Sequence, residues 1–290
     1  MTSEAAVPLK ESAHAADGYE LAVTRFPARA EPWATVVIAG AMGVRQDFYA
    51  PLARFLAAQG VHAVTFDYRG IGASRRGPLR ALRADVTDWA RKDLHAVLDQ
   101  AQGLAAELPL AVVGHSLGGQ ILGILPQPSR VRAALTVNAG SGWYRFNRHM
   151  WWQVRIFWFA AVPLLTPLFG YFPGRRLRMV GDLPKGVALQ WRRWCMHREY
   201  LLSEGEPMRE AFGRFRAPIL AISFEDDEMI TRAAVDEMHR HYSLAAIERR
   251  HFGPEETGRR VGHFGFFAEA SGESLWGPSL AWLRGAVSAG

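Results

Sequence analysis

Runs of apolar residues alternate along the chain with segments whose apolar residues recur at helical spacing. Solid apolar or β-branched runs indicate strands that are covered on both faces. They occupy residues 35–39, 61–66, 109–113, 131–137 and 218–224. Apolar residues three or four positions apart, as in 48–56 and 89–101, predict amphipathic helices between the strands. The alternation predicts an α/β fold with a mostly parallel central sheet flanked by helices.

Both ends of the chain extend this pattern. Residues 19–26 alternate polar and apolar after the turn dipeptide Asp17-Gly18, which predicts an N-terminal β-hairpin. After the strand at 218–224 we expect a helix at 231–242, a short strand at 246–250 and a last helix at about 278–287.

The pattern breaks between residues 141 and 209, where tryptophan, proline and arginine become frequent. The tryptophans are Trp143, Trp151, Trp152, Trp158, Trp191 and Trp194. We therefore predict that residues 1–140 and 210–290 form the core, and that residues 141–209 form an inserted, largely helical lid. Trp143, Trp151 and Trp158 are the candidates for a substrate pocket under this lid, although such residues commonly form a lid's own core.

One stretch of the predicted lid, residues 156–172, is nearly all apolar. It contains Pro163, Pro167 and Gly170 and is shorter than the ~20 residues of a typical membrane span. We therefore expect an apolar lid or interfacial patch and not a transmembrane helix. Residues 1–12 lack the basic start and apolar run of a signal peptide, so the expected location is the cytoplasm.

The net charge of +6 comes almost wholly from arginine. Arginines are scattered from Arg25 to Arg284, which argues against a nucleic-acid surface and leaves a weak attraction to anionic surfaces or substrates open. The single cysteine, Cys195, excludes an intramolecular disulfide and offers no metal cluster. We predict neither a metal nor another cofactor.

The stretch Val112–Gly119 (Val-Val-Gly-His-Ser-Leu-Gly-Gly) leads from an apolar strand into an apolar helical run. This is the strand–turn–helix context of the nucleophile-elbow motif. Holding Ser116 at the tip of a sharp turn crowds the backbone, which explains the glycines on both sides. Ser116 is therefore the candidate nucleophile; the alternative is a glycine-rich joint without chemistry.

A serine hydroxyl needs an imidazole to take its proton, and a carboxylate to orient that imidazole. Acids follow directly after the strand at 218–224. Asp227, close to the turn into the next helix, is the first candidate, with Asp226 as its competitor. Glu225 and Glu228 are interpreted as solvated or capping side chains.

His263, in the Gly-His-Phe-Gly segment before the last helix, is the candidate base. We interpret His239, His241 and His251 as ordinary surface histidines and His115 as a packing residue. The order Ser116, acid, His263 is the one that α/β-hydrolases use.

These features together resemble the α/β-hydrolase superfamily, nearest to its lipase-like and serine-aminopeptidase-like branch. The resemblance rests on Gly114–Gly119, Asp67–Ser74 and Gly262-His263, and it runs over nearly the full length. A bacterial group of predicted α/β-hydrolases is more narrowly similar, at Gly43-Val44, 183–187, Trp191, Trp194-Cys195, 224–228 and 262–267. The resemblance implies the fold and the mechanism, and much less about the substrate.

The family often carries His-Gly after its third strand, where a backbone N–H helps to bind the oxyanion. Here the stretch is Ile-Ala-Gly-Ala-Met-Gly, residues 38–43, so the histidine is absent. Because the donor is a main-chain N–H, we assign the oxyanion hole to Leu117 and Met42, or to Ala41 if the register shifts by one.

The sequence thus predicts a metal-independent serine hydrolase that cleaves an ester or thioester of an apolar acyl group through an acyl-enzyme on Ser116. Its alternatives are an aminopeptidase or amidase with the same triad, and a non-catalytic ligand-binding protein of this fold. A carboxylate in the lid would favour the aminopeptidase; the candidates are Glu199, Glu204 and Glu206. A further hypothesis is peripheral membrane contact through the lid, aided by Arg148, Arg155, Arg175, Arg176 and Arg178. The oligomeric state stays open.

Overall fold

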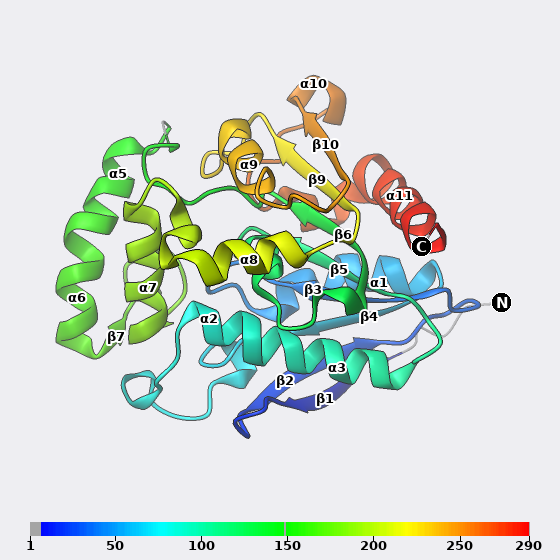
Figure 1. Cartoon of the computed structure of the whole chain (residues 1–290), viewed down its shortest axis with the longest axis horizontal. Helices are drawn as coiled ribbons and strands as arrows, with labels where there is room; N and C mark the ends of the chain where they lie inside the picture. Colours follow the sequence, from blue (N-terminus) through cyan, green and yellow to red (C-terminus); the bar gives the residue numbers. More distant parts are fainter. Residues whose placement is uncertain (1–6, 148, 290) are drawn as a thin grey trace.

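An eight-stranded sheet runs through the molecule, as the computed structural model of residues 7–147 and 149–289 shows (Figure 1). Its order is β1-β2-β4-β3-β5-β6-β9-β10. β1 pairs with β2, and β2 with β4, in antiparallel fashion; all other pairs are parallel, which confirms the predicted mostly parallel sheet. The strands are β1 (Leu9–His14), β2 (Glu20–Phe26), β3 (Ala34–Ala39), β4 (Val61–Phe66), β5 (Leu110–His115), β6 (Val131–Val137), β9 (Ile219–Phe224) and β10 (Ile247–Phe252).

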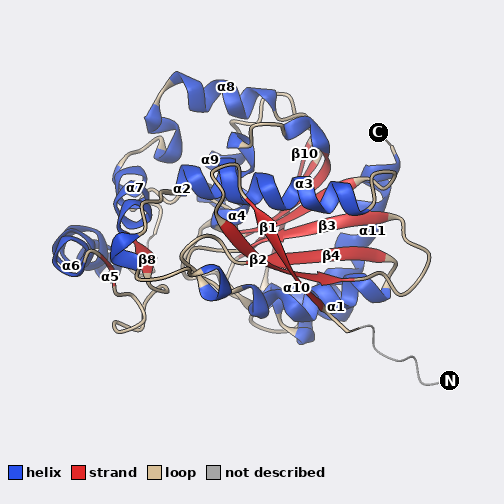
Figure 2. Cartoon of the chain, turned by 90° about the horizontal axis from the view of Figure 1, so that it is seen from below, coloured by secondary structure: helices blue, strands red, loops and turns tan. Residues whose placement is uncertain are grey.

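Helices cover both faces of this sheet. Figure 2 shows α3 on one face and α1 on the other. The helices outside the predicted lid are α1 (Ala50–Ala58), α2 (Val86–Asp88), α3 (His95–Leu104), α4 (Leu117–Gln120), α9 (Arg232–His239), α10 (Pro254–Thr257) and α11 (Gly277–Ser288). Side chains of α1 and α11 share one buried cluster, while those of α3 and α4 belong to a second cluster.

The solid apolar runs follow from burial on two sides. All six residues of β3 are buried. Val36 and Ile38 point into the cluster with α1 and α11, and Val37 and Ala39 point into the cluster with α3. Because successive strand side chains face opposite sides, a strand between two helix layers needs an apolar residue at every position.

The strand order reverses between β3 and β5. The chain passes from β3 to β4 on one side and then crosses back, so that β5 pairs with the other edge of β3, with Ala39 opposite Gly114. Ligands of open α/β sheets bind at the carboxyl ends of strands where the order reverses. The segments that follow β3 and β5 are therefore the ones the fold brings to a binding site.

Residues 138–218 lie between β6 and β9 and contain α5 (Trp151–Ile156), α6 (Val162–Phe169), α7 (Lys185–Met196), α8 (Glu206–Arg214) and a small hairpin of β7 (Tyr171–Phe172) and β8 (Leu183–Pro184). In Figure 1, α5, α6 and α7 lie at one end of the molecule. The predicted lid at 141–209 falls within this insertion, which is largely helical.

One helix in this insertion is longer than the prolines led us to expect. α5 and α6 join through a π-helical turn, Phe157–Ala161, into a continuous helix, Trp151–Phe169. Pro163 lies in the first turn of α6, where the wider π turn before it relieves the clash of its ring with the carbonyl four residues back. By length and mean hydropathy (19 residues, 1.3) this helix could cross a membrane, although nothing in the structure shows that it does; 22% of the window is buried.

His239 gives the fold a pH dependence that can be measured. Its ring is buried between the Val235 carbonyl and the Thr136 hydroxyl, at 2.8 Å from each. Burial lowers its pKa from 6.5 to about 4. Because the unfolded chain then binds a proton that the folded chain refuses, His239 alone should lower the free energy of unfolding by about 3 kcal/mol as the pH drops from about 7 to about 4. Chemical denaturation at both pH values should show a smaller loss for His239→Gln, which does not titrate; an equal loss in both proteins would contradict this.

Candidate active site

Ser116 lies at the turn between β5 and α4 with φ 48° and ψ −115°, angles that a serine rarely adopts. Gly114 and Gly118 make this turn possible. A Cβ on Gly114 would lie 2.5 Å from Gly119 Cα, and one on Gly118 would overlap the Ala39 carbonyl. The turn thus holds Ser116 in a strained backbone, partly exposed at the carboxyl end of β5, as a nucleophile elbow requires.

Asp227 and His263 form a buried pair. Asp227 Oδ2 lies 2.8 Å from His263 Nδ1, and both residues are 2% exposed. The other carboxylate oxygen accepts the N–H groups of Met229 and Ile230 at 2.7 and 2.9 Å. The carboxylate is therefore fixed from both sides, and it leaves Nε2 of His263 free to exchange a proton.

The two competing acids have different contacts. Asp226 accepts the N–H groups of Val261 and Gly262 at 2.8 and 3.0 Å, so it binds the backbone of the loop that carries His263. Asp227 is the acid that contacts the imidazole itself.

Ser116 and the loop that carries His263 lie at the same edge of the sheet, where β5 ends. The ring of His115, the residue before Ser116, lies with its centroid 5.1 Å from that of His263. In the described part of the chain, no hydrogen bond joins Ser116 Oγ to His263. Such bonds are often long in free enzymes and tighten when a substrate is bound.

Comparisons with known proteins agree with this geometry. A model of the family described as serine aminopeptidase, S33, matches residues 30–160, which include β3 and the turn at Ser116. The sheet order and the turn at Ser116 are those of the α/β-hydrolase fold. A comparison with curated proteins finds no match.

Solved structures of a lipase and of esterases are similar over nearly the whole chain. A soluble variant of monoglyceride lipase from Saccharomyces cerevisiae, in complex with a substrate analog, is 17% identical with a TM-score of 0.69, and the match covers 99% of this chain and 96% of that one. An esterase from Pyrococcus furiosus (13%, TM-score 0.63, 96% and 90% covered) and the esterase domain of a Rhodothermus marinus protein (16%, 0.57, 97% and 99%) are also similar. At these identities the likeness shows the fold.

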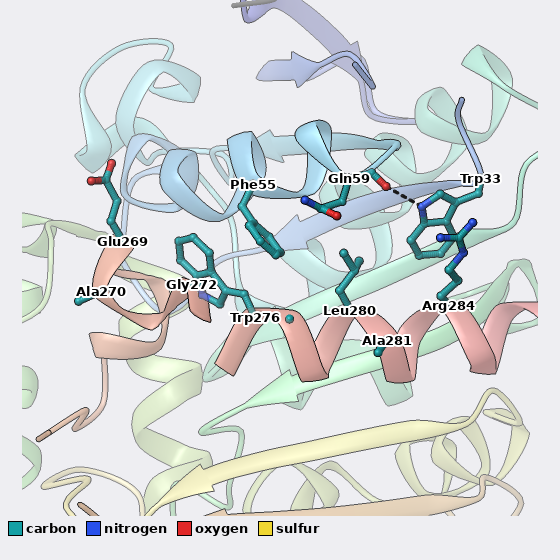
Figure 3. A pocket seen from close by; sticks show the side chains of 11 residues that line it. Trp33, Phe55, Gln59, Glu269, Ala270, Gly272, Trp276, Leu280, Ala281 and Arg284 are labelled. Carbon is teal, nitrogen blue, oxygen red and sulfur yellow. Dashed lines mark hydrogen bonds between the residues drawn. The ribbon is translucent and has the colours of Figure 1, made fainter. Parts of the chain in front are cut away.

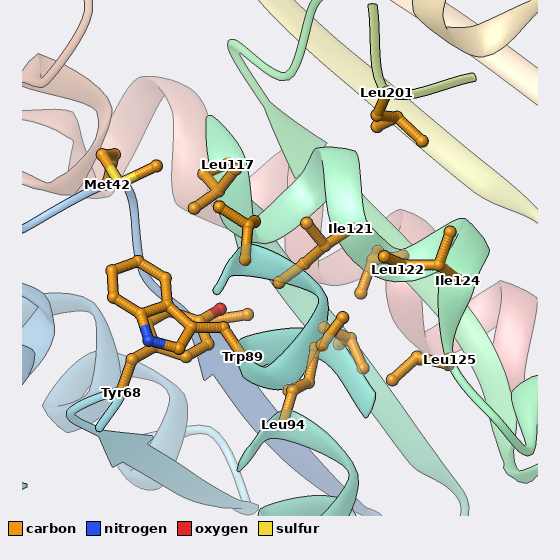
Figure 4. Close-up of a cluster of buried hydrophobic side chains, with 14 of the residues drawn as sticks. Met42, Tyr68, Trp89, Leu94, Leu117, Ile121, Leu122, Ile124, Leu125 and Leu201 are labelled. Atoms are coloured by element: carbon orange, nitrogen blue, oxygen red, sulfur yellow. The ribbon is translucent and has the colours of Figure 1, made fainter. Parts of the chain in front are cut away.

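The main-chain donors near Ser116 are not equally available. Ala41 N–H donates to Tyr49 Oη at 2.7 Å. No acceptor is found within the described residues for the N–H of Met42 or that of Leu117. Both residues are buried, and Figure 4 shows their side chains in one cluster. Of the two registers proposed for the oxyanion loop, the one with Met42 has the free donor.

His115 and Tyr49 connect the loops around the site. Tyr49 Oη accepts from Ala41 and lies 2.9 Å from His115 Nδ1, and His115 Nε2 lies 3.0 Å from the His263 carbonyl. Burial, followed by the nearby His263, holds the pKa of His115 well below its usual range. His115 is therefore neutral, with the tautomer that accepts from Tyr49 and donates to His263. It does more than pack, since it ties the base loop to the elbow.

Asn138 is a second residue that the sequence did not reveal. It follows β6 with φ 50°, and its Nδ2 donates to the carbonyls of Gly262 and His263, each at 3.1 Å. The one local signal for a special role at this position was an asparagine directly after a buried strand. Asparagine tolerates the left-handed backbone conformation that Asn138 adopts. Its partners lie more than 120 residues away, so their identity could not be read from the sequence.

The three candidate pocket tryptophans lie in different environments. Trp158 is 4% exposed and packs edge-on against Phe157 and Trp191 inside the insertion. Trp151 is 55% exposed, and Trp143 is half-buried beside Phe146. The structure does not bring them together, and their role in a substrate pocket stays a prediction.

A groove between α1 and α11, lined by Trp33, Phe55, Trp276 and Arg284 among others, is separate from this site (Figure 3). None of Ser116, Asp227 and His263 lines it. In the described ranges, no group of three or more His, Cys, Asp or Glu side chains is arranged to hold a metal.

The Tyr49 hydroxyl should contribute to stability because two buried groups depend on it. In Tyr49→Phe, Ala41 N–H and His115 Nδ1 lose their partner, and we expect the free energy of unfolding to fall by about 1–3 kcal/mol. Tyr144→Phe is the control: among the described residues its hydroxyl accepts a hydrogen bond from the exposed Arg145 alone, and its loss should cost less than about 0.5 kcal/mol. Urea denaturation measures both; equal losses would show that the Tyr49 hydroxyl does not hold the loops.

Proposed function

We propose that the chain is a metal-independent serine hydrolase that cleaves an ester or thioester of an apolar acyl group. The observation that carries the proposal is the strained Ser116 at the end of β5, at the same sheet edge as the buried Asp227–His263 pair. A structural joint between strand and helix does not require a serine in this conformation.

Each residue has a defined role in the proposed reaction. His263 Nε2 takes the proton of Ser116 Oγ as that oxygen attacks the acyl carbonyl. Asp227 holds the ring in the tautomer with its proton on Nδ1 and stabilises the imidazolium. The N–H groups of Leu117 and Met42 bind the oxyanion. His263 then protonates the leaving group, and a water activated by the same imidazole releases the acyl group from Ser116.

Ester cleavage is favoured over amide cleavage by two observations. The similar solved structures described above are those of a lipase and of esterases. The carboxylates that an aminopeptidase would need are engaged elsewhere: Glu204 accepts from Trp194 Nε1 at 2.7 Å, and Glu199 pairs with Arg209 at 3.0 Å. Glu206 is exposed near the same arginine. The matched family model, serine aminopeptidase, keeps the amidase as the second candidate.

The apolar acyl group is inferred from the insertion between β6 and β9. Its buried aromatic side chains belong to the same apolar cluster as Met42 and Leu117 beside Ser116, and its segment 138–142 continues directly from β6. A substrate that approaches Ser116 beneath such a layer gains free energy by burying apolar surface.

The test of the proposed function is Ser116→Ala with a fluorophosphonate probe and an acyl-ester panel. We expect wild-type labelling and ester turnover, with a higher kcat/KM for medium acyl chains than for acetyl. Ser116→Ala should not be labelled, and its turnover should fall by up to about 10⁶-fold, because the nucleophile is lost. Ser223→Ala is the matched control: Ser223 also lies near a strand end and contacts a histidine, His251, at 2.9 Å.

Three results would contradict the proposal. Labelling of Ser116→Ala would remove the nucleophile assignment. Faster turnover of aminoacyl anilides than of esters would establish the amidase. Tight ligand binding by a wild-type protein that is neither labelled nor active would establish the non-catalytic binding protein.

A further inference from the structure

The helix Trp151–Phe169 exposes a continuous apolar face. The most exposed side chains are Trp151, Trp152, Ile156, Phe159, Leu164 and Leu168, at 55, 52, 53, 52, 67 and 74%. The opposite face is buried and carries Phe157, Trp158, Val162 and Thr166. A monomeric protein rarely leaves so many large apolar side chains together in water, so this face calls for an occupant.

The π-helical turn keeps these side chains in one row. From Trp152 to Leu168, the large exposed side chains named above follow one another at intervals of four, three, five and four positions. The interval of five, from Phe159 to Leu164, falls where the π turn Phe157–Ala161 ends, and a π turn returns to the same face after five residues. A regular α-helix would have rotated Leu164 and Leu168 away from Phe159.

The positive charge of the chain is concentrated in the same segment. Residues 143–181 contain no aspartate or glutamate and six arginines: Arg145, Arg148, Arg155, Arg175, Arg176 and Arg178. The chain has 34 basic and 28 acidic residues, so without these six arginines the numbers are equal. Arginines are spread along the chain, but its whole net charge of +6 is found in this segment. Arg148 lies outside the described residues.

Three of these arginines lie on one turn beyond the end of the helix. Gly170, with φ 73°, ends the helix, β7 follows, and the turn Arg175–Met179 is exposed at every position. Leu177 and Met179 are 39 and 44% exposed between the arginines. α6 and β7 are in contact, and Figures 1 and 2 show α5 and α6 at one extremity of the molecule, where a flat surface could reach them.

We infer that this face docks on an anionic lipid bilayer, with the helix Trp151–Phe169 lying in the plane of the interface. Amphipathic helices bind such surfaces by burying large apolar side chains while basic residues contact lipid phosphates. The helix does not span the bilayer, because its other face stays packed against the protein: Trp158 and Phe157 contact Trp191 of α7. The inference concerns this surface and does not depend on the chemistry proposed for Ser116.

Co-sedimentation of the full chain tests the inference, with vesicles of equal parts phosphatidylcholine and phosphatidylglycerol compared with phosphatidylcholine alone. We expect binding to the anionic vesicles and much weaker binding to the neutral ones. Arg175→Gln/Arg176→Gln/Arg178→Gln should weaken the apparent affinity on the order of 100-fold, the equivalent of about 1 kcal/mol for each arginine. The matched control is Arg54→Gln/Arg214→Gln/Arg216→Gln, which removes the same charge from exposed positions elsewhere and should change it by less than about threefold.

A second pair of variants tests the apolar face. Phe159→Gln/Leu164→Gln/Leu168→Gln removes apolar surface from this face, and we expect it to abolish binding. Glutamine is a good helix former, so the helix itself should be preserved. Leu104→Gln/Leu244→Gln, at exposed leucines outside the face, should leave it unchanged. Circular dichroism and thermal unfolding of each variant distinguish a lost surface from a lost fold.

Four results would overturn the inference. The first is equal binding to neutral and anionic vesicles, and the second is an equal effect of the two arginine variants. The third is bound protein that resists extraction by alkaline carbonate, as a protein with a membrane-spanning helix does. The fourth is a dimer in solution that the apolar variant dissociates, which would show that a second copy of the chain covers this face.

Discussion

At Gly118 the turn after Ser116 comes so close to the Ala39 carbonyl that no side chain fits between them. This contact joins the carboxyl ends of β3 and β5, which are neighbours where the strand order reverses. Leu117 N–H and Met42 N–H, for which the described residues offer no acceptor, belong to the segments that follow β5 and β3. A larger residue at position 118 would separate them, so the proposed oxyanion site depends on the missing Cβ.

The loop that carries His263 is held in place by side chains from three strand ends. Asp226 binds its N–H groups, Asn138 and His115 bind its carbonyls, and Asp227 binds the imidazole. Because these partners lie at the carboxyl ends of β9, β6 and β5, the sheet itself fixes the position of the base. Such preorganisation orients the proposed base before the reaction begins, so that orienting it adds no free-energy cost to the reaction itself.

Much of the fold followed from local patterns in the sequence. β4 spans the apolar run at 61–66, and Ser116 lies in the turn that its flanking glycines predicted. Tyr49 gave no comparable signal, because its role comes from a contact with His115, 66 positions away. The sequence predicted a largely helical insertion but did not reveal the continuous helix Trp151–Phe169, in which a π turn precedes Pro163.

The central claim is that Ser116 and the Leu117 and Met42 N–H groups act on one acyl carbonyl. A crystal structure of the fluorophosphonate adduct tests it most directly, since the phosphonyl oxygen occupies the place of the oxyanion. The account predicts phosphorus bonded to Ser116 Oγ, with that oxygen about 3 Å from both nitrogens. An adduct on another residue, or a phosphonyl oxygen bound to Ala41 N–H with the Tyr49 bond broken, would contradict it.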